Sequence, residues 1–223
     1  MCGMVRLPSS IFVLPELSEM HVSRCEGLSL SEQDNGMQMV FNFFFNVKDL
    51  NLSGNNFTTL HAWIKECHLL RNLKMDDCSS LREIRGIPWK LEKFSVKGCK
   101  SLRCLDLTIL PECTAQCCFL KKLILDDCAC LREITGLPPN LDSFSAKGCT
   151  SLTSQSISML CNQEWVEAGN KKFFFPGKKI PKWFTHHTRG ESMSFWFRNK
   201  FPAISLCLVI GLGDESHIVA IST

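Results

Sequence analysis

The sequence contains no hydrophobic run long enough to cross a membrane. Its longest apolar run is residues 206–210, and runs such as 39–41 and 43–45 are shorter still, whereas a spanning helix needs about 20 apolar residues. The first residues also lack the basic and apolar regions of a secretory signal peptide. We therefore expect a cytoplasmic or nuclear protein, in which the 14 cysteines are reduced thiols rather than a disulfide framework.

Motifs for catalysis and cofactor binding are also missing. The sequence has no G-x-S-x-G nucleophile turn and no G-x-x-x-x-G-K-[ST] phosphate loop. A hydrolase built on His186 or His187 is the enzyme alternative, but an adjacent histidine pair is more often a surface feature.

A zinc site is a second alternative, since five cysteines lie close together, yet their spacings do not match the paired C-x₂₋₄-C pattern. Those cysteines are Cys113, Cys117, Cys118, Cys128 and Cys130. We expect no enzyme, no metal and no cofactor.

An internal duplication is the strongest positive signal. Residues 70–102 and 120–152 are offset by 50 positions (120 − 70), and 19 of these 33 positions are identical. Each copy divides further, because Leu70-x-x-Leu73-x-Met75-x-x-Cys78 recurs 21 residues later, from Leu91 (91 − 70). A repeat of this kind predicts stacked structural units rather than one compact globule.

The same frame occurs six times, starting at residues 17, 47, 70, 91, 120 and 141. Leucine-rich repeats run about 20 to 29 residues with the frame L-x-x-L-x-L-x-x-N/C-x-L. The frame therefore predicts a leucine-rich-repeat α/β solenoid with a curved parallel sheet. We expect this solenoid, with its C-terminal cap, to occupy residues 1–162. Gly86-Ile87-Pro88 and Gly136-Leu137-Pro138-Pro139 predict an irregular or 3₁₀-like convex side rather than long helices.

The frame also predicts the direction of side chains. Because side chains alternate along a strand, Leu73, Met75, Leu123 and Leu125 should point into the core. The ninth position, Cys78 in the third unit, should turn inward and hydrogen-bond backbone groups that the turning chain leaves unpaired.

Outward side chains of the strands should form a concave partner-binding face. The face carries both signs of charge, with a lysine excess that would suit an acidic partner. Solvated side chains without a ligand are the alternative for any one position. The candidate residues are Asn72, Lys74, Asp76, Lys93, Ser95, Lys97, Lys122, Ile124, Asp126, Ser143, Ser145 and Lys147, preceded by Glu19, His21, Ser23, Asp49, Asn51 and Ser53.

A different pattern begins after the repeats. Residues 173–184 contain a Pro176-Gly177 turn, residues 193–197 read as an aromatic strand, and residues 204–210 and 217–221 read as further strands. We expect residues 163–223 to form a small all-β sandwich that the chain leaves incomplete. Eight basic and three acidic residues between 163 and 203 give a balance of +5 (8 − 3). Nucleic-acid binding is therefore an alternative, although aromatic residues in a sandwich core explain the composition better.

These residues resemble the C-terminal end of plant TIR-type nucleotide-binding leucine-rich-repeat disease resistance proteins. Two features carry the resemblance: the cysteine-containing repeat, as in Asp76-Asp77-Cys78, and the motif that follows the repeats. The motif residues are Pro176, Gly177, Ile180, Pro181, Trp183, Phe184, Phe195, Trp196 and Phe197. In that family the stretch belongs to a jelly-roll/Ig-like domain.

The resemblance implies a role in the defence response. The repeats and the jelly-roll module would recognise a pathogen effector, contact other domains of the receptor to hold it inactive, or do both. The nucleotide-binding domain and the NAD-cleaving TIR domain of the family have no counterpart in these 223 residues. The alternatives are a leucine-rich-repeat adaptor or scaffold outside immunity, and a receptor fragment without a function of its own. In each case we expect the partner to be a protein rather than a small molecule.

Overall fold

The computed structural model describes most of the repeat region and three strands beyond it. The described residues are 17–25, 46–60, 62–107, 119–138, 141–153, 155–156, 171–177, 180, 205–212 and 215–222.

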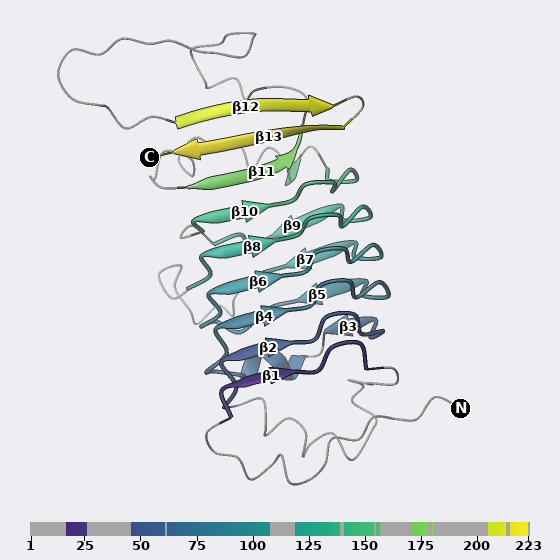
Figure 1. The fold of residues 1–223 in the computed structure, drawn as a ribbon, viewed down its shortest axis with the longest axis vertical. Helices are drawn as coiled ribbons and strands as arrows, with labels where there is room; N and C mark the ends of the chain where they lie inside the picture. Colours follow the sequence, from purple (N-terminus) through teal and green to yellow (C-terminus); the bar gives the residue numbers. More distant parts are fainter. Residues whose placement is uncertain are drawn as a thin grey trace, which may run out of the picture.

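One long sheet, which we call the front sheet, runs the length of the molecule (Figure 1). Its first six strands come from the six repeat frames and are parallel in register. Each is three residues long with its middle residue buried. In spatial order the nine strands are β1 (Glu19–His21), β2 (Asp49–Asn51), β4 (Asn72–Lys74), β6 (Lys93–Ser95), β8 (Lys122–Ile124), β10 (Ser143–Ser145), β11 (Lys172–Pro176), β13 (Glu215–Ser222) and β12 (Ser205–Leu212). The predicted stack of parallel strands is confirmed.

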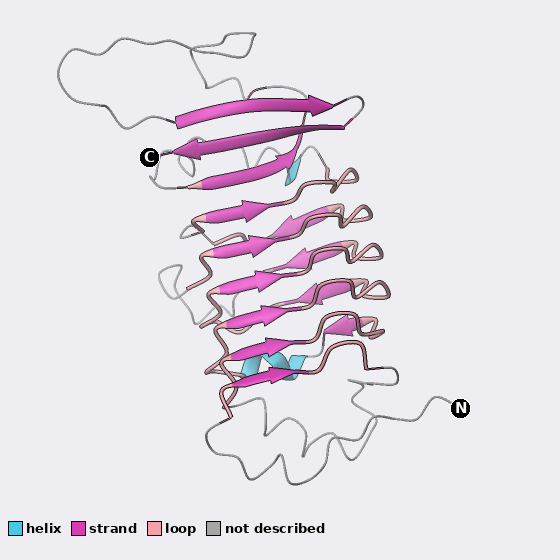
Figure 2. Cartoon of the chain, in the orientation of Figure 1, coloured by secondary structure: helices cyan, strands magenta, loops and turns pink. Residues whose placement is uncertain are grey.

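The return path of each unit forms a second parallel sheet, the back sheet. It contains β3 (Thr59–Leu60), β5 (Glu83–Arg85), β7 (Cys104–Asp106) and β9 (Glu133–Thr135). Figure 1 shows these strands behind the front sheet and running in the opposite direction. The prediction of an irregular convex side is therefore wrong for these units, although the exclusion of long helices holds for the described residues. Helix is confined there to short pieces such as the 3₁₀ helix Ala62–Glu66 (Figure 2).

A return path made of strands can follow the spacing of the front strands. Hydrogen-bonded strands lie about 4.8 Å apart, whereas a packed helix is about 10 Å wide. Strands on the return path keep the spacing of the front sheet, so their backbone groups pair in the same register. Arg82 N, for example, donates to Thr58 O at 2.8 Å, and Arg103 N donates to Arg82 O at 2.8 Å.

The core lies between the two sheets and consists of side chains stacked in rows. In the front sheet the register aligns Leu50, Leu73, Phe94, Leu123 and Phe144, and continues to Phe173. A row from the back sheet faces it, comprising Leu60, Ile84, Leu105 and Ile134. All are buried, and each contributes about 1.5–3 kcal/mol by leaving water. Leu73, Met75, Leu123 and Leu125 point inward as predicted.

The segment after the repeats extends the front sheet. Strand β11 pairs in parallel with β10, and β13 and β12 follow in antiparallel pairing. The strands expected at 204–210 and 217–221 are thus present as β12 and β13. The buried side chain of Lys171 ties this extension to the repeats, since its Nζ donates to Leu141 O at 3.0 Å.

The sandwich itself stays a prediction. The described strands beyond residue 163 belong to a single sheet, and most of the motif that follows the repeats lies outside the described residues. Of that motif, Pro176 ends β11, Gly177 follows it, and Ile180 is half-buried. Pro181, Trp183, Phe184, Phe195, Trp196 and Phe197 are not described. Most of the predicted cap after residue 152 is also outside the described residues, but Ser156 Oγ accepts a hydrogen bond from Ile134 N at the last back strand.

Every frame turns through the same backbone conformation. The residue before the ninth position has a positive φ in all six units, with values between 55° and 71°. The residues are Arg24, Gly54, Asp77, Gly98, Asp127 and Gly148. This left-handed conformation redirects the chain from the front strand into the turn, and only glycine adopts it without cost.

A Gly148→Ala substitution tests this turn. The new Cβ would lie 2.8 Å from Asp127 Oδ1 at a residue whose φ is +70°. We expect a loss of about 1–2 kcal/mol in the free energy of unfolding, measured by urea denaturation. Thr150→Ala, two residues on at an exposed position, is the control and should change stability by less than about 0.5 kcal/mol. Equal effects of the two substitutions would show that the turn imposes no such constraint.

Candidate protein-binding face

The outward side of the front sheet is the candidate binding face, and we call it the front face. Strand residues on either side of each buried middle residue point outward, so each three-residue strand contributes two. The residue that follows the strand by two positions adds a third. The structure places all twelve predicted residues of units three to six on this face, in three rows that cross the strands.

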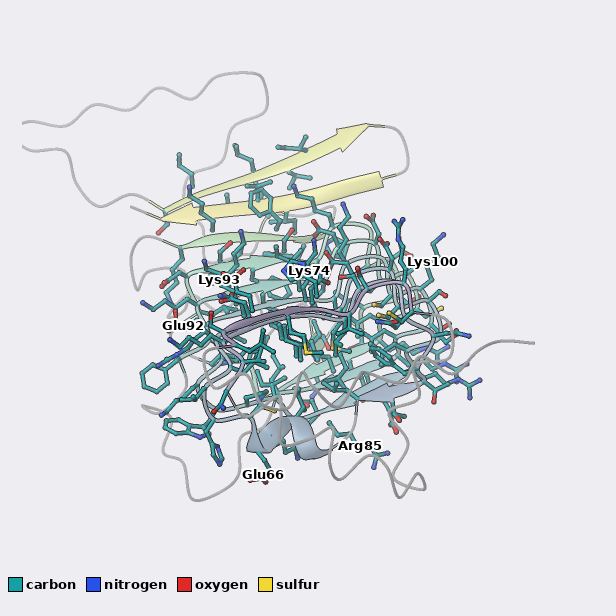
Figure 3. All side chains as sticks on the ribbon, turned by 60° about the horizontal axis from the view of Figure 1, so that its bottom comes forward. Glu66, Lys74, Arg85, Glu92, Lys93 and Lys100 are labelled. Carbon is teal, nitrogen blue, oxygen red and sulfur yellow. The ribbon has the colours of Figure 1, made fainter. Side chains whose placement is uncertain are left out.

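The candidate residues differ in accessibility. The five lysines, Lys74, Lys93, Lys97, Lys122 and Lys147, are exposed. The other seven are half-buried between neighbouring strands: Asn72, Asp76, Ser95, Ile124, Asp126, Ser143 and Ser145. Figure 3 shows Lys74 and Lys93 on one side of the molecule, with Arg85 of the back sheet and Glu66 of the 3₁₀ helix on the opposite side.

Two aspartates of the face connect neighbouring strands by hydrogen bonds, and we call these contacts the aspartate clasps. Asp76 Oδ1 accepts hydrogen bonds from Ser95 Oγ at 2.6 Å and from Lys97 N at 3.0 Å. The duplicated unit repeats the arrangement, with Asp126 Oδ1 accepting from Ser145 Oγ at 2.5 Å and Lys147 N at 3.0 Å. These aspartates and serines therefore hold the sheet in register, and their hydrogen-bonding groups are already occupied within it.

Some lysines of the face have partners within the protein. Lys74 Nζ lies 3.3 Å from Asp76 Oδ2, and Lys97 Nζ lies 3.8 Å from Asp127 Oδ2. Lys147 Nζ lies 4.3 Å from the ring centroid of Phe174, within the range of a cation–π interaction. Lys93 and Lys122 have no acidic partner within the described part of the chain.

Sequence reasoning missed two residues of this face, Lys172 and Phe174. Both lie on β11, whose register places Lys172 beside Ser143 and Phe174 beside Ser145. Strand β11 follows β10 by 29 residues (172 − 143), the same spacing that separates β8 from β6 (122 − 93). The alternation of buried Phe173 and Phe175 is the signal that could have identified a seventh front strand.

An aromatic pair borders the front face where β6 and β8 begin. The rings of Trp89 and Phe119 lie 6.0 Å apart at 52°, and Lys90 Nζ lies 4.6 Å from the Trp89 ring centroid. Phe119 is 42% exposed. Exposed aromatic side chains of this kind are enriched in protein interfaces.

Behind the face, ninth-position side chains form a ladder through the core. Asn55 Nδ2 donates to Val22 O at 2.6 Å and to Leu52 O at 2.8 Å. In the later units a buried thiol donates to a carbonyl of the preceding unit. These bonds are Cys78 to Leu52 at 3.3 Å, Cys99 to Met75 at 3.1 Å, Cys128 to Val96 at 3.0 Å and Cys149 to Leu125 at 3.0 Å. The predicted role of the ninth position is confirmed.

Each thiol of the ladder donates a hydrogen bond to a carbonyl, and this contact stabilises its neutral form. The pKa of Cys99 and the pKa of Cys149 are raised, first by hydrogen bonding to the Cys128 side chain and further by burial. Outside the ladder, burial together with the negative charge of Glu66 raises the pKa of Cys67 to about 12. Burial also raises the pKa of Cys207 to about 11.

The described residues show neither a metal-binding cluster nor a membrane-spanning helix. No group of three or more histidine, cysteine and acidic side chains there is arranged to hold a metal ion. Cys128 belongs to the ladder and Cys130 is exposed, whereas Cys113, Cys117 and Cys118 lie outside the described residues, as do His186 and His187. Within the described segments, no helix has the length and apolar character needed to span a membrane.

Of the comparisons with known proteins, the one with solved structures found matches. No family model matches the chain, and no curated protein matches it in sequence. Among solved structures, the leucine-rich repeat domain of the type III effector XopL is similar with a TM-score of 0.32 and 21% identity, over 66% of each chain. The chain thus spans less than two thirds of that domain. The leucine-rich-repeat fold itself follows from the six frames and the register of their strands.

Stability should decrease at alkaline pH because of the buried thiols. For Cys67, the folded-state pKa lies above the usual value of 9.0, at about 12. The unfolded chain therefore loses thiol protons first, and the contribution to stability is complete below pH 9 and lost between pH 9 and 12. We expect a loss of about 1 kcal/mol from Cys67 between pH 9 and 10, measured by urea denaturation under reducing conditions.

Two variants separate this effect from other alkaline titrations. Cys67→Ala should lower stability at neutral pH and reduce the decrease between pH 9 and 10. Cys130→Ser, at an exposed thiol, should leave that decrease unchanged. A decrease that is the same in the wild type and in Cys67→Ala would contradict the assignment.

Proposed function

We propose that this chain is a protein-recognition module and that the front face is its binding surface. The observation that carries the proposal is the face itself: three rows of outward side chains, held at the spacing of a hydrogen-bonded sheet, with five exposed lysines and a bordering aromatic pair. Repeat proteins use extended surfaces of this kind to bind other proteins.

Rigidity supports the proposal. A front strand is joined to its neighbours by backbone hydrogen bonds, by the aspartate clasps and by the ladder behind it. The backbone of the face is therefore ordered before binding, which reduces the conformational entropy that association costs.

We further propose that the module belongs to an intracellular immune receptor of plants, where it recognises a pathogen effector or contacts other receptor domains. The support is the resemblance of the repeats and of the motif after them to TIR-type receptors. The continuous pairing of β10 with β11 is compatible with this proposal, because it makes the repeats and the following segment one structural body. As part of the same proposal, the chain is not an enzyme and acts in the cytoplasm or nucleus.

A random-peptide display library selected on the purified 223-residue chain tests recognition by the front face. We expect enriched peptides whose binding is lost in Ile124→Arg, because the arginine side chain would obstruct the middle of the face. Binding would be measured by biolayer interferometry.

Thr135→Arg is the matched control for this experiment. Ile124 and Thr135 are β-branched third residues of consecutive strands, β8 on the front and β9 on the back. Peptides that bind both variants equally, or a library without enrichment, would exclude the front face as a recognition surface.

The receptor proposal predicts the composition of the native transcript. We expect the reading frame, determined by sequencing the 5′ end of the transcript, to continue upstream of Met1 into a nucleotide-binding domain with a G-x-x-x-x-G-K-[ST] loop. A transcript that begins its coding region at Met1 would contradict that proposal without affecting recognition by the front face.

A further inference from the structure

Three lysines of the front face occupy one row of the sheet. Lys93 and Lys122 are direct register partners on neighbouring strands, Ser143 follows Lys122, and Lys172 follows Ser143. All three lysines are exposed. We call Lys93, Lys122 and Lys172 the lysine row.

The lysine row has no acidic counterpart among the described residues. Two carboxylates of the neighbouring positions have other partners: Glu92 pairs with Arg71 at 3.1 Å, and Asp126 Oδ1 accepts hydrogen bonds from Ser145 Oγ and Lys147 N. Like charges directly opposite one another on neighbouring strands oppose sheet formation. The fold therefore does not require the Lys93–Lys122 pair, and it does not neutralise the positive charge of the two side chains.

Charge along this row changes sign from one end of the face to the other. Toward the first units the same row carries Glu19 and Asp49, and Asn72 separates them from the lysine row. A ligand that is acidic over its whole length would be repelled by the first units. The complementary ligand is a short acidic segment, confined to strands β6, β8, β10 and β11.

We propose that the lysine row binds an acidic peptide segment of a partner protein, with carboxylates at alternate positions. The proposal rests on the recognition function proposed above and names the chemistry of the partner. From Lys93 to Lys172 the row crosses three strand spacings, or about 14 Å at about 4.8 Å each. An extended peptide covers about 13 Å between residues i and i+4, with the side chains at i, i+2 and i+4 on one side. Three alternating carboxylates therefore match the row.

Apolar side chains lie in the adjacent row. Ile124 and Phe174 are half-buried there, on β8 and β11, and they reduce the access of water to one side of the lysines. Partial exclusion of water strengthens the attraction between an ammonium group and a carboxylate. A nucleic acid fits this surface less well, because Asp76, Asp126 and the first acidic units lie close to the path of its phosphates.

The test uses the full chain and a labelled synthetic peptide with three glutamates at alternate positions, separated by serines. Fluorescence anisotropy should show binding that weakens as salt increases, as expected for exposed charges. Replacement of the glutamates by glutamines should abolish binding. The double variant Lys93→Glu/Lys122→Glu should weaken binding by about tenfold or more, and Lys93→Gln/Lys122→Gln should weaken it less.

A double charge reversal away from the face is the matched control. Lys100→Glu/Arg103→Glu changes two exposed residues by the same total charge, and Figure 3 places Lys100 away from Lys93, on the opposite side of the view. This variant should bind the glutamate peptide within about twofold of the wild type. Circular dichroism of all variants should match that of the wild type, since every substituted side chain is exposed.

Several outcomes would overturn the proposal. These are equal binding of the glutamine peptide, equal weakening in the control variant, or tighter binding of a single-stranded RNA than of the glutamate peptide. Self-association in sedimentation that the Lys93→Glu/Lys122→Glu variant abolishes would identify a second copy of the chain as the acidic partner instead. The glutamate peptide could show no binding while display-selected peptides bind in an Ile124-dependent manner. That result would contradict the acidic-peptide proposal and would support the recognition function.

Discussion

The hydrogen-bonded spacing of parallel strands is the constraint from which the rest of the structure follows. Each unit advances by one strand separation, about 4.8 Å, because the front strands of successive units pair in register. The return path has the same advance and therefore pairs as the back sheet. The rows of the core, the ladder and the left-handed turn recur at the same interval, since each unit repeats its neighbour's backbone conformation.

That constraint also decides what the front face can do. Residues at equivalent frame positions are brought side by side, even when they lie 21 or 29 residues apart in the chain (93 − 72 and 122 − 93). Where the aligned residues are aspartate and serine, they bind one another and hold the strands together. Where both are lysine, as at 93 and 122, the row presents uncompensated charge to solvent. Residues that hold the strands together and residues of the proposed binding site therefore lie on the same surface, and the register decides which of them become neighbours.

Much of this organisation could be predicted from the repeat frame. The inward direction of Leu73, Met75, Leu123 and Leu125 follows from alternation along a strand, and the hydrogen-bonding role of the ninth position follows from the turn. The back sheet could not be predicted in the same way, because the glycines and prolines of the return path are typical of an irregular segment. Ile84, Leu105 and Ile134 gain their strand conformation from pairing with neighbouring units, which is a property of the stack and not of one unit's sequence.

The sequence by itself determined the repeating unit, its core positions, its ladder and the outward direction of the candidate residues, because these depend on local periodicity. Only the tertiary structure decided which outward residues become neighbours. Lys172 and Phe174 joined the face because β11 pairs with β10 although it lacks the repeat frame. The structure also showed that Lys74 and Lys97, outside the lysine row, form ion pairs within the protein. Pairing between distant segments depends on backbone hydrogen bonds and on the summed burial of many units, neither of which a single stretch of sequence contains.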